Sequence, residues 1–310
     1  MLLKTLRTRD FDELAAAFPR WDLRFRQFGR GPFRGHLHFL QLGGIQVFRT
    51  AVNRMMHIEG WSPPGSFGCF PVLAANENAV WSGRRLKAGQ VRVFNPSQEA
   101  DHVTAADHYH LVALAVDGDL FRQAVPVLGG FDLEERLVGK EVVTTSPASC
   151  RALWSHLVGL FDLAQAQPDL LAQSGQLIEQ ECHRRIAGLL ARSNDDRTAR
   201  QPSKRARVVR RAEDYMRAHL GDPLSVLNLC RELGVRERTL HYAFQEVRGL
   251  SPMAYFQACR LNAVRQELKT APATATVQEI AQRWGFWHTG EFAAAYRRLF
   301  GELPSQTLNG

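Results

Sequence analysis

The sequence predicts an α+β protein, with an N-terminal antiparallel β-barrel and helical hairpin followed by an all-α C-terminal domain. Short apolar runs separated by turn residues continue to about residue 145, which is typical of a barrel or sandwich. The apolar period then becomes helical, and the last hundred residues contain an internal repeat. A chain of 310 residues is long enough for two such domains.

The composition is that of an ordinary globular protein, with 45% apolar and 23% charged residues. No apolar run approaches the roughly 20 residues of a membrane-spanning helix, and the N-terminus lacks a signal-peptide core. We therefore expect a cytoplasmic protein without a membrane partner. The five cysteines are scattered and never form a CxxC pair, which argues against a disulfide framework or a zinc site.

The positive charge is concentrated near the C-terminus. From residue 201 onward, 16 Lys and Arg face 10 Asp and Glu, whereas residues 1–200 hold 23 against 21. This excess favours a polyanion as the partner of the C-terminal domain.

Residues 20–145 are expected to form the β-domain, because turn residues such as Gly43–Gly44 and Pro63–Pro64 interrupt its apolar runs at hairpin-like intervals. Residues 147–192 are expected to form two amphipathic helices in a hairpin. The apolar stripe of this hairpin either packs on the domain's own sheet or forms a dimer interface. Residues 193–205, SNDDRTARQPSKR, are polar throughout and indicate a flexible linker.

The C-terminal repeat aligns residues 226–235 with 277–286, and one added residue after the second glycine shifts the alignment of the segments that follow. In each copy a small residue, Cys230 or Ala281, stands four positions before Gly234 or Gly285. The glycine permits the positive φ of a tight turn between two helices. This is the pattern of a helix-turn-helix, and we expect units at about 225–248 and 276–300 joined by a long helix.

These residues resemble the tandem DNA-binding domain of the AraC/XylS family of bacterial transcription regulators. The similarity covers about 206–309 and is most specific in VQEIAQRWGFWHTGEFAAAYRRLFGELPSQTL. Residues 1–192 are similar only in layout to the family's cupin-like effector-binding and dimerisation domain. The resemblance implies a regulator, with activators among the family, that binds double-stranded DNA as a homodimer. It also implies a small-molecule effector and allows RNA polymerase as a further partner.

In the first unit, the helix from about Arg236 should bury Leu240, Ala243 and Phe244 and expose its other face. By resemblance, the base-reading positions are Arg238, His241 and Tyr242, and Arg can bond guanine bidentately. The DNA-facing set for this helix is Arg236, Arg238, Thr239, His241, Tyr242 and Gln245.

In the second unit, Phe292, Tyr296, Leu299 and Phe300 have core spacing, and Trp284 and Phe286 align with core positions of the first copy. Because Gly and Ala carry no hydrogen-bonding side chain, this helix is expected to position the domain while the first discriminates bases. Two such helices would enter successive major grooves roughly 34 Å apart. The DNA-facing set here is Trp287, His288, Thr289, Gly290, Ala293, Ala294, Arg297 and Arg298.

The N-terminal half offers weaker signals. His36 and His38 have the i, i+2 spacing of metal ligands on a strand, and His57, His102, His108 or His110 could add a third ligand, but we expect no metal or other cofactor. Glu232 and Glu279 lack a paired carboxylate or histidine, so no catalytic residue is predicted. The alternative function is a cupin-like metalloenzyme with a helical interaction appendage. The residues expected to line an effector pocket are Arg49, Arg54, His57, Trp61, Trp81, Arg92 and Phe94, and the arginines hint at an anionic ligand.

Overall fold

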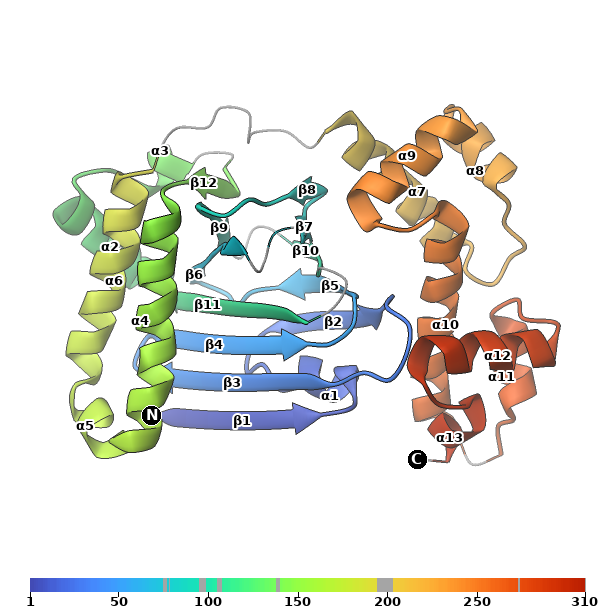
Figure 1. The fold of residues 1–310 in the computed structure, drawn as a ribbon, viewed down its shortest axis with the longest axis horizontal. Helices are drawn as coiled ribbons and strands as arrows, with labels where there is room; N and C mark the ends of the chain where they lie inside the picture. The colour runs from blue at the N-terminus through green and yellow to red at the C-terminus, as the bar shows by residue number, and fades with distance from the viewer. Residues whose placement is uncertain are drawn as a thin grey trace.

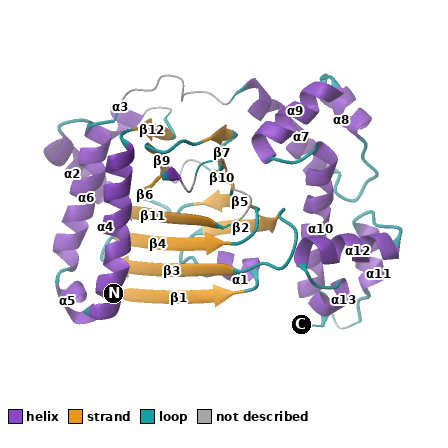
Figure 2. Ribbon diagram, in the orientation of Figure 1, coloured by secondary structure: helices purple, strands orange, loops and turns teal. Residues whose placement is uncertain are grey.

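The structure, a computed structural model, describes residues 1–309 apart from 75–76, 78, 95–98, 105–107, 138–139, 194–202 and 273. A β-sandwich with a layer of helices forms the N-terminal part, and a set of shorter helices packed around one long helix forms the C-terminal part (Figure 1). All described strands lie before residue 145, as Figure 2 shows.

Two antiparallel sheets make up the sandwich. The larger has the order β1 (Leu2–Thr8), β3 (Gly35–Leu42), β4 (Ile45–Val52), β11 (Tyr109–Asp117), β6 (Ser66–Pro71), β9 (Gln90–Phe94) and β12 (Val142–Thr144). The smaller has the order β2 (Asp22–Gln27), β5 (Met56–Trp61), β10 (Ala100–Val103), β7 (Val80–Trp81) and β8 (Arg84–Arg85).

The expected closed barrel is therefore wrong, although the predicted α+β class with an antiparallel N-terminal region is confirmed. Within the described residues, no hydrogen-bonded ladder joins the edge strands of one sheet to those of the other. The physical reason is visible in β7 and β8, which have two residues each and are too short to continue the ladder. Aromatic side chains fill the space between the sheets instead.

The larger sheet is covered on both faces, so its strands divide their apolar residues between two cores. In β3, Leu37 and Phe39 point between the two sheets, whereas Leu40 and Leu42 point toward the helices. This alternation follows from the two-residue period of a strand.

Six helices belong to the described N-terminal part: α1 (Phe11–Ala16), α2 (Gly118–Gly129), α3 (Leu133–Leu137), α4 (Pro147–Ala166), α5 (Pro168–Gln173) and α6 (Gly175–Ala191). Leu153, Leu157, Leu160 and Ala164 of α4 are all buried in the core beneath the larger sheet. The apolar stripe of the predicted hairpin therefore packs on the domain's own sheet. Helix α2 was not predicted, because Pro126 and the glycines around it are typical of a turn.

Seven helices follow: α7 (Lys204–Ala218), α8 (Val226–Leu233), α9 (Glu237–Arg248), α10 (Pro252–Thr270), α11 (Val277–Arg283), α12 (Thr289–Phe300) and α13 (Pro304–Leu308). The two predicted helix-turn-helix units are confirmed as α8–α9 and α11–α12, with α10 between them (Figure 1). Helix α7 begins inside the range expected for the linker, and most of the remaining linker, 194–202, lies outside the described residues.

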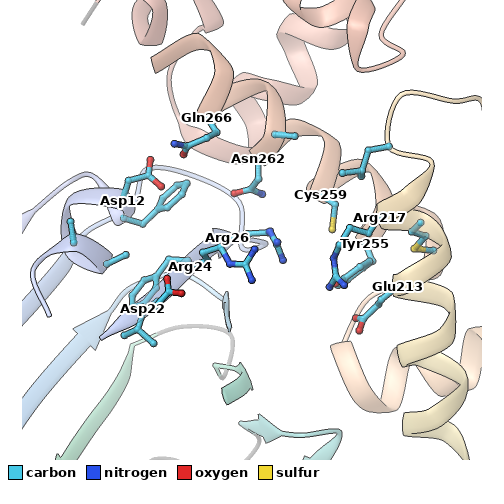
Figure 3. Close-up of a pocket in the computed structure, with 18 of the residues that line it drawn as sticks. Asp12, Asp22, Arg24, Arg26, Glu213, Arg217, Tyr255, Cys259, Asn262 and Gln266 are labelled. Atoms are coloured by element: carbon cyan, nitrogen blue, oxygen red, sulfur yellow. The ribbon is translucent and has the colours of Figure 1, made fainter. Parts of the chain in front are cut away.

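Buried polar contacts join the two parts. The amide of Asn262 in α10 pairs with the backbone of Gln27, accepting from its N–H at 3.0 Å and donating to its carbonyl at 2.9 Å. The guanidinium of Arg265 lies 3.2 Å from Asp10 and 2.5 Å from Asp12. Between these contacts, β2 faces α7 and α10 across a cleft of about 560 Å³. Figure 3 shows Arg24 and Arg26 on one wall of this cleft and Arg217 and Tyr255 on the other.

Candidate nucleic-acid interface

The first unit is fixed by a capped helix, a glycine turn and an apolar interface. Ser225 caps α8, accepting from Asn228 N–H while Asn228 accepts from Ser225 N–H. Gly234 ends the helix with a φ of 65°, as the turn requires. Leu240 and Phe244 of α9 are completely buried, so the orientation of α9 is set by packing.

The opposite face of α9 is open to solvent over its whole length. Arg238 lies over the ring of Tyr242, with its guanidinium carbon 5.4 Å from the ring centroid and Nη2 3.3 Å from the hydroxyl. This contact aligns two side chains that can both donate to base edges. Of the six residues in the predicted DNA-facing set, five are exposed and His241 is half-buried, 3.8 Å from Glu237.

The second unit repeats this construction. Thr276 and Glu279 form the capping box of α11: the Glu279 carboxylate accepts from Thr276 N–H, and Thr276 Oγ1 accepts from Glu279 N–H. Gly285 turns the chain with a φ of 75°. Phe292, Tyr296, Leu299 and Phe300 are buried as predicted, whereas Trp284 and Phe286 are only half-buried.

Trp287 is the most prominent side chain of this second surface. It lies just before α12 and is 68% exposed, so the folded monomer does not bury this large aromatic side chain. His288, Thr289, Gly290 and Ala294 are exposed beside it, and Ala293 is half-buried. The small residues leave the backbone of α12 open to close approach.

Helices α9 and α12 also differ from α7, α8, α10 and α11 in how they begin. Side chains of Ser203, Ser225, Ser251 and Thr276 cap α7, α8, α10 and α11, respectively. The N-cap residues of α9 and α12 are Arg236 and His288, and neither makes a side-chain cap hydrogen bond. The first N–H groups of both helices therefore remain available to a phosphate. Sequence reasoning could have found this contrast in the types of residue at the N-caps.

Arginines that form no ion pair among the described residues lie at the start of α9 and in the last turn of α12. In the part of the chain that the structure describes, Arg236, Arg238, Arg297 and Arg298 form no ion pair, although other arginines of this domain do. The connecting helix α10 has 19 residues and is therefore about 28 Å long at 1.5 Å per residue. That length is comparable with one turn of duplex DNA, about 34 Å.

The seven residues expected in an effector pocket do not all come together. Trp81, Arg92 and Phe94 line a cavity between the two sheets. Arg49 is exposed on the opposite face of β4, and Trp61 lies at the surface at the end of β5. Arg54 donates to the carbonyl of Asn53 in a surface loop.

His57 lies at the boundary between the two parts. Its Nε2 is 2.9 Å from Asp101, and its Nδ1 is 3.4 Å from the hydroxyl of Tyr255 in α10. Burial would raise the pKa of Asp101, but the charge of Arg248 and the hydrogen bond from His57 outweigh it and lower that pKa. His57 is therefore part of a polar cluster that holds the two parts together.

The histidines considered as metal ligands are not gathered into a site. His36 and His38 lie on β3, with Arg49 opposite His38 on β4. Burial and the charge of Arg49 lower the pKa of His38. No group of three or more His, Cys, Asp or Glu side chains suited to a metal ion occurs among the described residues. Within the same residues, no helix is both long enough and apolar enough to cross a membrane.

Comparison with known proteins agrees with this geometry. A family model described as a helix-turn-helix domain matches residues 229–310. A probable thc operon regulatory protein of Rhodococcus erythropolis is 34% identical over 188 residues, 59% of this chain and 53% of that protein. XylDLEGF operon transcriptional activator 3 of Pseudomonas putida is 37% identical over 103 residues, 33% of this chain and 30% of that protein.

A solved structure of a probable AraC family transcriptional regulator from Rhodopseudomonas palustris is 37% identical, with a TM-score of 0.32, and the match covers 33% of this chain and 95% of that one. The chain spans about half the length of the first curated relative and under a third of the second. The matched region overlaps both units described above, so the C-terminal part of the chain is a helix-turn-helix domain similar to those of these regulators.

Proposed function

We propose that the protein is a sequence-specific, double-stranded DNA-binding regulator of transcription rather than an enzyme. The observation that carries this proposal is the pair of uncapped helices, α9 and α12, each with an exposed face and unpaired arginines at one end of a buried helical core. A location in the cytoplasm, with the DNA, belongs to the same proposal. Two relatives are named as an operon regulator and an operon activator.

We further propose a division of work between the two helices. Helix α9 presents Arg238, His241, Tyr242 and Gln245, which can all hydrogen-bond base edges. Helix α12 presents Gly290, Ala293 and Ala294, which permit close approach but carry no donor. In this proposal α9 discriminates bases, while α12, Arg297 and Arg298 bind phosphates and fix the register.

The test is a binding series. Duplexes selected from a random pool by the full-length protein would define the preferred site, and affinities would then be measured on single-base variants of each half-site. Arg238→Ala should relax discrimination at one or two positions, at a cost of about 1–3 kcal/mol. Arg298→Ala should weaken the binding of all duplexes alike. The matched control is Arg205→Ala, because Arg205 of α7 is already paired with Glu246 of α9. If Arg238→Ala weakened all sequences equally while His288→Ala changed the preference, the division of work would be reversed.

Dimerisation and an encounter with RNA polymerase are further proposals. Leu177 of α6 is 70% exposed, so the outer face of the hairpin retains an apolar position for a second copy. Sedimentation of the wild-type chain and of Leu177→Ser would test this, because a monomeric wild type contradicts it. Contact with RNA polymerase would be tested by transcription from a promoter carrying the selected site.

A small effector bound in the N-terminal part completes the proposal. The cavity between the two sheets supports it, because several of the side chains that line this aromatic space carry a buried polar atom without a hydrogen-bond partner in the described part of the chain. An effector changes DNA binding only if it binds one arrangement of the two parts better than another. Thermal-shift screening with metabolites tests this step, and a lack of stabilisation by any of them would count against it.

A further inference from the structure

The cavity between the sheets is aromatic on most sides. Phe18, Phe48 and Trp21 form one side, with ring centroids 5.2–5.3 Å apart for the pairs that Phe48 makes. On another side, Trp81 stacks on His102 at 3.8 Å, and Phe70 lies 4.5 Å from Trp81. These side chains come from both sheets, so the cavity is a feature of the sandwich core.

Four polar atoms of its lining side chains have no hydrogen-bond partner among the described residues: Ser62 Oγ, Trp81 Nε1, Arg92 Nε and His102 Nε2. The side chains that carry them are buried, with exposed fractions of 7%, 8%, 1% and 1%, respectively. Buried polar atoms in folded proteins are almost always hydrogen-bonded, and each unpaired one destabilises the fold. Four unpaired atoms around one cavity therefore point to a bound species that supplies partners to some of them.

The charge of the cavity wall limits what this species can be. Arg92 is already neutralised, since Nη2 lies 3.2 Å from Glu141 and Nη1 donates to the carbonyls of Val93 and Glu141. Burial lowers the pKa of His102 well below its usual value, so this ring is neutral. The wall therefore carries no uncompensated positive charge, and a buried anion would lack a counter-charge.

The size of the cavity sets a second limit. Its volume is about 60 Å³. One buried water needs at least about 10–15 Å³, so the cavity holds at most about four to six water-sized groups. A benzene-sized ligand needs more, since the cavity known to bind benzene measures about 150 Å³.

We propose that this cavity binds a compact, uncharged organic molecule of about four to six non-hydrogen atoms, with an acceptor oxygen facing Ser62, Arg92 and His102. This inference rests on the proposed control by a small effector and assigns that effector a chemical class. This class differs from the anionic ligand that Arg49 and Arg92 suggest in the sequence, because Arg92 is paired with Glu141 and Arg49 lies outside the cavity.

Two probes of nearly identical shape test the charge selectivity. Butanone and propionate each have five non-hydrogen atoms and one carbonyl, but propionate has a charged oxygen where butanone has a methyl group. Their binding to the full-length protein would be measured by saturation-transfer NMR titration without DNA. Because no DNA is present, a failure of the proposed DNA-binding function would not affect the result. We expect butanone to bind in the millimolar range and propionate at least about ten-fold more weakly.

Variants locate the binding. Ser62→Ala and His102→Phe each remove one unpaired polar atom, and each should weaken butanone about three- to ten-fold. The melting temperature of the ligand-free Ser62→Ala protein should not fall, because the hydroxyl has no partner to lose. Ser66→Ala is the matched control, since its hydroxyl donates to Pro63 and does not line the cavity. Ala113→Val, which fills the cavity without removing a polar atom, should abolish binding.

Propionate that bound as tightly as butanone would overturn the neutral class. Butanone that bound equally to wild type and Ala113→Val would place the site elsewhere. If neither probe bound and long-lived buried waters were detected in the core, the cavity would be a hydration site and the proposal would be wrong.

Discussion

Replacing Arg248 by Met tests whether the two parts of the chain are held together by a buried charge network. Arg248 is only 3% exposed at the end of α9. Its guanidinium donates to Glu213 at 2.5 and 2.8 Å, within the C-terminal part, and to Asp101 at 3.0 and 2.9 Å, across the boundary. Met fills a similar volume but leaves both carboxylates without their cation.

The magnitude follows from the burial of those carboxylates. Glu213 is buried, and breaking a buried ion pair by removing one partner costs about 3–5 kcal/mol. In Asp101→Asn, Arg248 keeps its pair with Glu213 and the new amide can still bond to His57, so this change at a half-buried position should cost only about 1 kcal/mol. Adding Glu213→Gln to Arg248→Met should recover part of the loss, because no buried charge then remains unpaired on α7.

The assay is urea unfolding of the full chain at pH 7, followed by tryptophan fluorescence. With a slope of about 2–3 kcal/mol/M, the expected loss moves the midpoint by about 1–2 M. A shift below about 0.3 M for Arg248→Met would refute the reasoning, because it would mean that solvent already replaces this network in the folded protein.

Three further predictions concern the glycine turns, acid stability and salt dependence. Gly234→Ala and Gly285→Ala both place a side chain at positive φ, at a cost of about 1 kcal/mol. Only at Gly285 would the new Cβ also meet the carbonyl oxygen of Gly221, at 2.9 Å. Thermal melts should therefore show the larger loss of stability for Gly285→Ala. The folded pKa values of Asp101 and Glu59 are lowered by neighbouring cations despite burial, so the stability that these carboxylates contribute is present above pH ~4 and is lost as the pH falls below it. Urea midpoints measured at pH 7, 5, 4 and 3 should therefore decline most steeply below pH 4. The decline should be smaller for Asp101→Asn. The slope of log affinity for DNA against log salt should fall by about 1 in Arg298→Ala and stay constant in Arg205→Ala; equal slopes in all three proteins would remove Arg298 from the phosphate contacts.

The C-terminal units could be predicted from sequence because their determinants are local and occur twice. Gly234 and Gly285 stand at equivalent places, and the buried residues of α9 and α12 repeat at helical spacing. The lining of the cavity could not be predicted in the same way. Because both faces of the larger sheet are buried, Val47 and Phe48 are equally apolar while belonging to different cores. Nothing in the pattern therefore indicates that Arg92 points into the sandwich and Arg49 points away from it.

The role of His57 was beyond sequence reasoning for a different reason. Its partners are Asp101 and Tyr255, which are 44 and 198 residues away along the chain. No periodic pattern links positions so far apart. The same holds for Gln27 and Asn262, whose reciprocal bonds depend on how β2 meets α10.

These long-range contacts explain how the docked chain leaves open both surfaces that we propose to face DNA. The N-terminal part contacts α9 and α12 at their C-terminal ends, through Asp101 to Arg248 in one case and through Gly31 N–H and the Gln27 amide to the last-turn carbonyls of Arg298 and Leu299 in the other. The N–H groups that suit a phosphate are at the opposite ends of both helices. Docking therefore does not compete with DNA for the same backbone groups. Under the proposed function, an effector would control DNA binding by changing the angle and spacing of two helices held at one end, rather than by covering them.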